Sequence, residues 1–258
     1  MQVKPTLEGD FFTDQVHRVL YATDASQYKE LPQAVCRPQS VADIRKIIAY
    51  ARENHSSVIP RGAGTSLAGQ VVGPGIVVDV SKYMNRILEF NKEEHYVVVE
   101  PGVVLAELNL FLAQHGLQFG PETSTANRCV IGGMLGNNSC GLHSLVYGSV
   151  REHVLEVDAI LADGSLATFR ALSKEEFLQK LSDYSNPLEH SIYQYINQLL
   201  SDSENQDEIR THFPAPELTR RNMGYAIDVL LNSEIYTEGG EPFNFCKLLA
   251  GSEGTLAF

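Results

Sequence analysis

Residues 60–69, PRGAGTSLAG, follow the apolar run SSVIP and are the most informative stretch of the chain. Their three glycines allow positive φ angles and close approach of the backbone, while Thr65 and Ser66 add hydroxyl donors. Consecutive main-chain N–H groups in such a loop can form a nest that binds an anion such as a diphosphate. Arg61 could add positive charge to such a site or brace the loop. A tight glycine turn without a ligand is the alternative interpretation.

Two familiar phosphate loops do not fit this stretch. A P-loop needs a lysine near its end, and none is present here. A Rossmann loop needs a helix directly after its last glycine, but only QVVGPG separates Gly69 from the predicted strand IVVDV at 76–80. The expected arrangement is therefore strand, loop, strand.

A second glycine-rich region lies at 119–148, FGPETSTANRCVIGGMLGNNSCGLHSLVYG. It shows neither helical nor strand periodicity, so we expect an irregular segment. A compact domain keeps so long an irregular segment mainly when that segment binds something. Two donor-rich loops that flank an α/β unit could wrap an extended cofactor.

Composition narrows the function classes. The chain has 258 residues, is 43% hydrophobic and carries a formal charge of −12. This length suits one large domain or two small ones, and the acidic charge argues against a nucleic-acid surface or an anionic membrane face. No signal peptide or membrane span is expected, so a cytoplasmic protein is predicted. The four cysteines form no CxxC pair or metal cluster, which favours buried thiols over two disulfides.

Periodicity predicts several further elements. Helices are expected at 41–54, where Ser40 and Asp43 form a capping pattern, and at 103–115. Hairpins are expected at 86–100 and at 153–169, where Asp163-Gly164 forms the turn. The charged segment 171–212 is predicted to be a peripheral helical insertion with a solvated face.

Four stretches in order carry a family resemblance: PRGAGTSLAG, PETSTANRCVIGGMLGNNSCG, YGSVREHVLEVDAILADG, and GYAIDVL followed by LLAGSEGTLAF. Over about residues 20–258 the chain resembles the FAD-binding domain of the vanillyl-alcohol oxidase / p-cresol methylhydroxylase (PCMH) superfamily. Within it, the chain is similar to the D-lactate and glycolate dehydrogenase branch of FAD-linked oxidases, and to bacterial members fused to a C-terminal iron–sulfur domain. The resemblance implies an α+β, two-lobed PCMH-type FAD-binding domain with the helical insertion at about 171–212. It places a first lobe at 20–91 and a second at 92–258, truncated before a cap or substrate domain.

The resemblance also implies where FAD binds. The amides of 61–66 with Gly69 would bind the pyrophosphate, 121–124 would follow the ribityl chain and flavin, and Glu253 would lie near the adenosine half. The residues implied to bind FAD are Pro60, Arg61, Gly62, Ala63, Gly64, Thr65, Ser66, Gly69, Pro121, Glu122, Thr123, Ser124, Asn127, Gly132, Gly133, Asn137, Gly141, Gly148, Glu253 and Gly254.

Relatives that attach flavin covalently often have a histidine where this loop has Thr65, so we expect non-covalent FAD. His143 is the histidine beside the cofactor loops, and a packing or hydrogen-bonding role is favoured over contact with flavin or substrate. Cys140 has no expected histidine or acidic partner, so it is interpreted as a small buried residue and not as a nucleophile.

The implied reaction is oxidation of a D-2-hydroxy acid, of the D-lactate, glycolate or D-2-hydroxyglutarate class, by hydride transfer to FAD. A base and an arginine clamp for the carboxylate are expected beyond residue 258. Arg220 and Arg221 are clamp candidates, with surface charges as the alternative. Catalytic residues and the electron acceptor are thus unassigned, no metal is expected, and any iron–sulfur cluster belongs to the missing C-terminal part.

The chain of 258 residues is expected to be inactive as an enzyme on its own. The partner is a small molecule and not nucleic acid, and peripheral membrane association is compatible with the full-length protein. One alternative is a flavoenzyme like UDP-N-acetylenolpyruvoylglucosamine reductase. The other is a nucleotide-binding module without redox activity.

Overall fold

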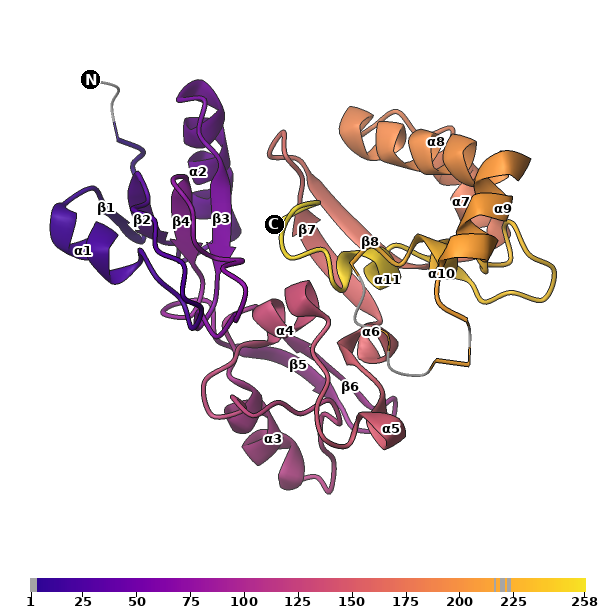
Figure 1. The fold of residues 1–258 in the computed structure, drawn as a ribbon, viewed down its shortest axis with the longest axis horizontal. Coiled ribbons are helices and arrows are strands. Elements are labelled where there is room, and N and C mark those ends of the chain that lie inside the picture. The colour runs from indigo at the N-terminus through magenta and orange to yellow at the C-terminus, as the bar shows by residue number, and fades with distance from the viewer. Residues whose placement is uncertain (1–3, 216, 219–220, 222–223) are drawn as a thin grey trace. The chain divides into compact units, whose positions relative to one another are not determined.

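The computed structural model describes residues 4–215, 217–218, 221 and 224–258. The chain has a mixed α+β fold (Figure 1) and divides into two compact units. The first unit comprises Met1–Leu135 and Cys140–His143, and the second comprises Gly136–Ser139 and Ser144–Phe258. The α+β fold class is confirmed. The boundary between these compact units differs from the boundary between the lobes expected at 20–91 and 92–258. The two FAD-binding lobes stay a prediction.

A four-stranded sheet with the order β1-β2-β4-β3 forms the centre of the first unit. Its strands are β1 (Asp10–Phe12), β2 (Ala34–Arg37), β3 (Val58–Arg61) and β4 (Ile76–Asp79). β4 runs parallel to both β2 and β3, whereas β1 is antiparallel to β2. All four residues of β4 are buried, as the apolar run at 76–80 suggests for a parallel strand inside a sheet.

Helix α2 (Val41–Glu53) confirms the helix predicted at 41–54. The Ser40 side chain accepts a hydrogen bond from the Asp43 N–H, as the capping pattern predicted, and Ile44, Ile47 and Ile48 are buried. The shorter helix α1 (Gln15–Leu20) buries no side chain.

The hairpin predicted at 86–100 is present as the antiparallel pair β5 (Ile87–Asn91) and β6 (Tyr96–Val99). Helix α3 (Leu105–Ala113) confirms the helix expected at 103–115, and Gly116 follows it with φ at +75°. Leu108 and Leu112 of α3 form a small core that packs against apolar residues of the hairpin, within the first unit.

The second unit is built on a three-stranded sheet of β7 (Glu156–Ile160), β8 (Leu166–Leu172) and β9 (Phe243–Asn244). β7 and β8 confirm the hairpin predicted at 153–169, and Gly164 in their turn has φ at +86°. The short helices of this unit are α5 (Ser144–Tyr147), α6 (Val150–His153), α10 (Ile227–Leu231) and α11 (Cys246–Leu249).

The insertion is helical as predicted, with α7 (Lys174–Lys180), α8 (Pro187–Ser201) and α9 (Ser203–His212), of which α8 and α9 are orange in Figure 1. Its description as peripheral was wrong, because one apolar side of it enters the core of the second unit. Phe177, Tyr193 and Leu200 are each at most 1% exposed and belong to one cluster with Phe243 and Phe245.

The region 119–148 was expected to be irregular, but part of it is helical. Residues Ile131–Asn137 form helix α4, within which the boundary between the two units falls, and α5 lies further on. Glycines lower the helix propensity of IGGMLGN, but the buried Met134 and the hydrogen bond from the Gly132 N–H to the Pro101 carbonyl hold its first turn.

All four cysteines are free. Over the described ranges, no helix combines the length and the apolar character that crossing a membrane requires.

Candidate functional site

The first glycine loop leaves β3 after Arg61 and enters the parallel β4 at Ile76, with no helix between them. Gly64 and Gly69 have φ angles of +65° and +80°, as expected for a glycine-dependent loop. The Gly64 carbonyl accepts a hydrogen bond from the Ala25 N–H at 3.0 Å, which anchors the loop. Within the described chain the main-chain N–H groups of residues 63–66 donate no hydrogen bond. The loop is therefore fixed by a carbonyl while successive amide donors stay unused.

Arg61 braces this loop from behind. Its guanidinium donates to the carbonyls of Thr23 at 2.9 Å and Tyr21 at 3.4 Å, and lies 5.2 Å from the centroid of the Tyr21 ring. A Cβ built on Gly64 would lie 2.5 Å from the Arg61 Nη2 atom, so only glycine fits there unless the guanidinium moves. Burial lowers the pKa of Arg61, but a guanidinium stays charged at any ordinary pH. The bracing role and the positive charge thus occur together.

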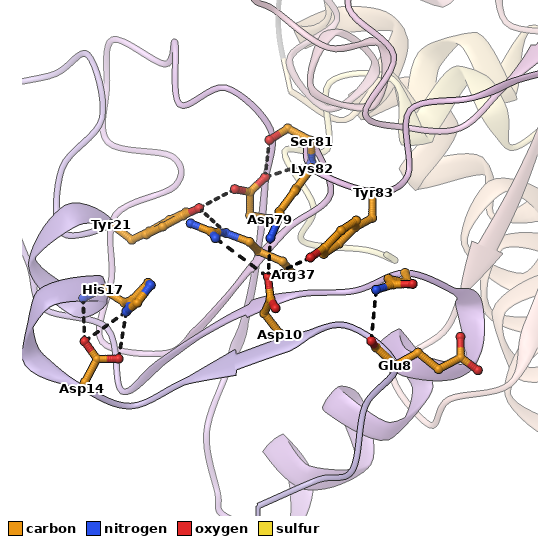
Figure 2. A network of polar contacts seen from close by, with 11 residues as sticks. Glu8, Asp10, Asp14, His17, Tyr21, Arg37, Asp79, Ser81, Lys82 and Tyr83 are labelled. Carbon is orange, nitrogen blue, oxygen red and sulfur yellow. Dashed lines mark hydrogen bonds and ion pairs between the residues drawn. The ribbon is translucent and has the colours of Figure 1, made fainter.

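Tyr21 connects this brace to the sheet through the polar network shown in Figure 2. The Tyr21 hydroxyl donates to Asp79 Oδ2 at 2.6 Å and accepts from Arg37 Nε at 3.0 Å. Asp79, at the end of β4, also accepts from the Ser81 hydroxyl at 2.6 Å. Burial raises the pKa of Tyr21, and its hydrogen bond to Asp79 adds to the effect. The carboxyl ends of β3 and β4 are in this way tied to one tyrosine.

The two glycine-rich regions meet within the first unit. A Cβ built on Gly62 would lie 2.3 Å from Val130 Cγ2, so the first loop packs directly against the second. Within the second region, a Cβ on Gly141 would lie 1.8 Å from the Glu122 carbonyl oxygen. The Thr123 hydroxyl lies 3.2 Å from the sulfur of the buried Cys129. Close backbone packing therefore holds this part of the second region.

The residues expected along the ribityl chain differ in exposure. Ser124, Asn127 and Gly133 are exposed, whereas Pro121 is buried. The Asn127 side chain accepts a hydrogen bond from Arg128 at 2.8 Å.

His143 makes a polar contact, as its predicted hydrogen-bonding role requires. Its Nδ1 lies 2.5 Å from Glu122 Oε1, and both side chains are partly exposed. Cys140 is half-buried, which agrees in part with its interpretation as a small buried residue.

The second unit contains a cavity of about 260 Å³. Two of the predicted cofactor residues line it, Asn137 and Glu253. Glu253 has φ at +54°, and its N–H donates to the carbonyl of Gly136, a residue of the same unit, at 2.8 Å. The complete lining is Asn137, Asn138, Gly224, Tyr225, Gly251, Ser252, Glu253 and Thr255.

Neither Gly148 nor Gly254 lines this cavity, although both were predicted to bind FAD and both have positive φ. Gly148 instead precedes α6, where Glu152 accepts from the Ser149 N–H at 2.6 Å. The lining residue Tyr225 was not predicted, and Asn138 was considered only as a hydrogen-bond donor of the second glycine-rich region. Asn138 has φ at +47°, a conformation that asparagine tolerates well, and the NN pair was the available signal.

One of the two candidates for the carboxylate clamp, Arg221, is engaged in an ion pair. Arg221 Nη2 lies 2.5 Å from Asp228 Oδ2, in an ion pair with little exposure. This pairing makes Arg221 a structural cation in the present arrangement, neither a free clamp nor a surface charge. Arg220 lies outside the described residues.

Parallel strands joined by a glycine loop with unused amides, in a mixed α+β chain, form an arrangement that can bind an anion such as a diphosphate. A family model described as an FAD binding domain matches residues 32–170, so the chain belongs to this FAD-binding family.

Two relatives are D-2-hydroxyglutarate dehydrogenases. The protein of Escherichia coli is 40% identical over 255 residues and that of Haemophilus influenzae is 39% identical over 259 residues. Each alignment covers 97% of this chain and 24% of the relative, so the chain spans about a quarter of the length of these relatives.

Among solved structures, 6-hydroxy-D-nicotine oxidase from Arthrobacter nicotinovorans aligns with a TM-score of 0.57 and 20% identity, over 70% of this chain and 40% of that one. This likeness establishes the PCMH-type fold. The chain thus contains an FAD-binding domain and is homologous to D-2-hydroxyglutarate dehydrogenases.

Proposed function

We propose that this chain binds FAD non-covalently and forms the flavin domain of a D-2-hydroxy-acid dehydrogenase. The observation that carries the proposal is the unused row of amides at residues 63–66, backed by the Arg61 guanidinium. Such an amide row suits a diphosphate, because each N–H can donate to a phosphate oxygen. A nearby charged guanidinium adds attraction without occupying the site.

A part of the cofactor is proposed for each group of predicted residues. The loop from Pro60 to Gly69 would bind the diphosphate, and residues 121–124 with Asn127, Gly132 and Gly133 would follow the ribityl chain and flavin. In the second unit, the cavity lined by Asn137 and Glu253 would accept the nucleoside half, where a carboxylate can accept hydrogen bonds from ribose hydroxyls. Thr65 cannot form the bond that a histidine makes to flavin, which supports a dissociable cofactor.

The substrate class rests on the relatives, whose names state D-2-hydroxyglutarate as substrate. Bound FAD would accept the hydride from the substrate's Cα. The Arg221–Asp228 ion pair argues against Arg221 as the carboxylate clamp. We therefore propose that the clamp and the base lie beyond residue 258 in a longer protein, as does any iron–sulfur cluster. The four free thiols support a cytoplasmic location.

The test is the visible absorption spectrum of the purified chain, before and after acid precipitation. We expect a flavin spectrum that passes entirely into the supernatant. Colour retained in the pellet would refute the non-covalent part of the proposal, and no uptake of added FAD by folded protein would refute the binding itself.

The substrate class is tested on the full-length protein. Reduction of the flavin by a D-2-hydroxy acid supports it. Reduction by NADPH in place of the hydroxy acid would favour the reductase alternative.

A further inference from the structure

Arg151 is a buried arginine of the second unit, 5% exposed, that no sequence pattern marked as functional. Its guanidinium donates to three main-chain carbonyls: Lys247 at 2.8 Å, Ala250 at 2.6 Å and Gly224 at 3.3 Å. One side chain thereby joins two segments that are distant in sequence.

Both segments line the cavity of this unit. Gly224 is part of the lining, and Ala250 directly precedes the lining residues Gly251 and Ser252. Gly251 has φ at +94°, and a Cβ built on it would lie 3.1 Å from Arg151 Nη2. The guanidinium therefore lies immediately behind the backbone of the cavity wall.

The main-chain N–H and carbonyl of Arg151 also form hydrogen bonds near the cavity. Its N–H donates to Asn138 Oδ1 at 2.9 Å, and its carbonyl accepts from Lys247 Nζ at 2.8 Å. Asn138 also lines the cavity and accepts from the Ser149 hydroxyl at 2.8 Å. Arg151 thus connects three parts of the lining, around residues 138, 224 and 251.

The charge of Arg151 is not neutralised by a direct ion pair. Among the described residues, no carboxylate lies within ion-pair distance of its guanidinium, and the acceptors are carbonyl dipoles. Burial lowers the pKa of Arg151, yet the guanidinium remains charged. The guanidinium therefore fixes the shape of the cavity wall from behind, through main-chain carbonyls on both segments.

We propose that Arg151 is a positioning residue for FAD: it holds Gly224 and Gly251 so that the cavity accepts the nucleotide half of the cofactor. This inference rests on the proposed function. Arg151 plays in the second unit the part that Arg61 plays behind Gly64 in the first, with carbonyl acceptors and a positive-φ glycine against the guanidinium.

The test compares two flavins, because FMN has the isoalloxazine ring but lacks the AMP half. Dissociation constants for FAD and FMN are measured by flavin fluorescence on wild type, Arg151→Met, Arg151→Lys and the control Arg170→Met. Arg170 belongs to the same unit but is exposed and pairs with Glu176. Thermal melts establish that each variant is folded.

We expect Arg151→Met to weaken FAD binding about tenfold or more, because several charge-assisted hydrogen bonds are lost, while FMN binding changes less than about threefold. Arg151→Lys should fall between, because it keeps the charge but not the geometry, and Arg170→Met should match wild type. If Arg151→Met does not fold, Arg151→Lys takes its place, and its loss of FAD affinity should exceed its loss of FMN affinity.

Equal loss of FAD and FMN affinity, or unchanged FAD affinity in the folded variant, would overturn the role of Arg151. Failure of wild type to bind FAD would instead refute the proposed function, so the two failures are distinguishable.

Discussion

Gly62 lies so close to Val130 that a methyl group at position 62 would overlap the valine side chain, with the built Cβ 2.3 Å from Val130 Cγ2. Val130 is 2% exposed and cannot easily move away. This contact joins the diphosphate loop to the second glycine-rich region within the first unit, so the two parts of the candidate site share one packing constraint.

The first prediction concerns that contact. Gly62→Ala should destabilise the fold by about 1–3 kcal/mol through overpacking and weaken FAD binding. Val130→Ala should relieve the overlap, so the double variant should be more stable than the sum of the two single effects implies. Urea unfolding of the four proteins measures this coupling. Strict additivity would show that the two loops do not share this contact.

The second prediction concerns the brace behind Gly64. Arg61→Met should weaken FAD binding about tenfold, because it removes the hydrogen bonds to Thr23 and Tyr21 and a positive charge behind the amides. The matched control is Arg210→Met, which removes an exposed arginine in α9. Calorimetric titration with FAD measures both. Equal affinities in the two folded variants would mean that Arg61 has no part in binding.

Local signals predicted the elements well where they agreed with one another. At α2, the Ser40 cap and the apolar face of Ile44, Ile47 and Ile48 specify the same helix. At the β7–β8 turn, Asp163-Gly164 supplies the conformation that the hairpin needs. The strand–loop–strand arrangement around the glycine loop was predicted correctly because the few residues between Gly69 and β4 leave no room for a helix.

What escaped prediction depends on contacts between distant residues. Arg151 bonds to the carbonyl of Ala250, 99 positions away, and no local pattern carries that information. The same holds for the bracing role of Arg61, which depends on its bonds to the carbonyls of residues 21 and 23. The ion pair of Arg221 with Asp228 likewise required the fold to be seen.

The third prediction tests whether the helical insertion is part of the core. Leu200 in α8 is fully buried, whereas Leu178 in α7 is 55% exposed. Leu200→Ala should lower the free energy of unfolding by about 2–5 kcal/mol through the cavity it leaves. Leu178→Ala, the same chemical change, should cost within about 0.5 kcal/mol. Urea denaturation distinguishes them, and similar costs would favour a peripheral insertion after all.

The fourth prediction concerns Asp43, a fully buried carboxylate near the start of α2. Burial raises the pKa of Asp43, but hydrogen bonds from the N–H groups of Gln39, Glu8 and Gly9 together outweigh it and hold the pKa below its ordinary value. A carboxylate whose pKa is lowered by folding stabilises the fold above its unfolded-state pKa of roughly 3.9, and this stabilisation is lost as the pH falls through the lower folded-state pKa.

Asp43→Asn should therefore destabilise the protein by about 1–3 kcal/mol at pH 7, because the amide cannot accept three N–H bonds as a carboxylate does. The difference from wild type should shrink as the pH is lowered below about 4. Urea unfolding midpoints at pH 7, 5, 4 and 3 measure it, with the exposed Asp207→Asn as control. A difference that stays constant over this range would show that the charge of Asp43 does not stabilise the fold.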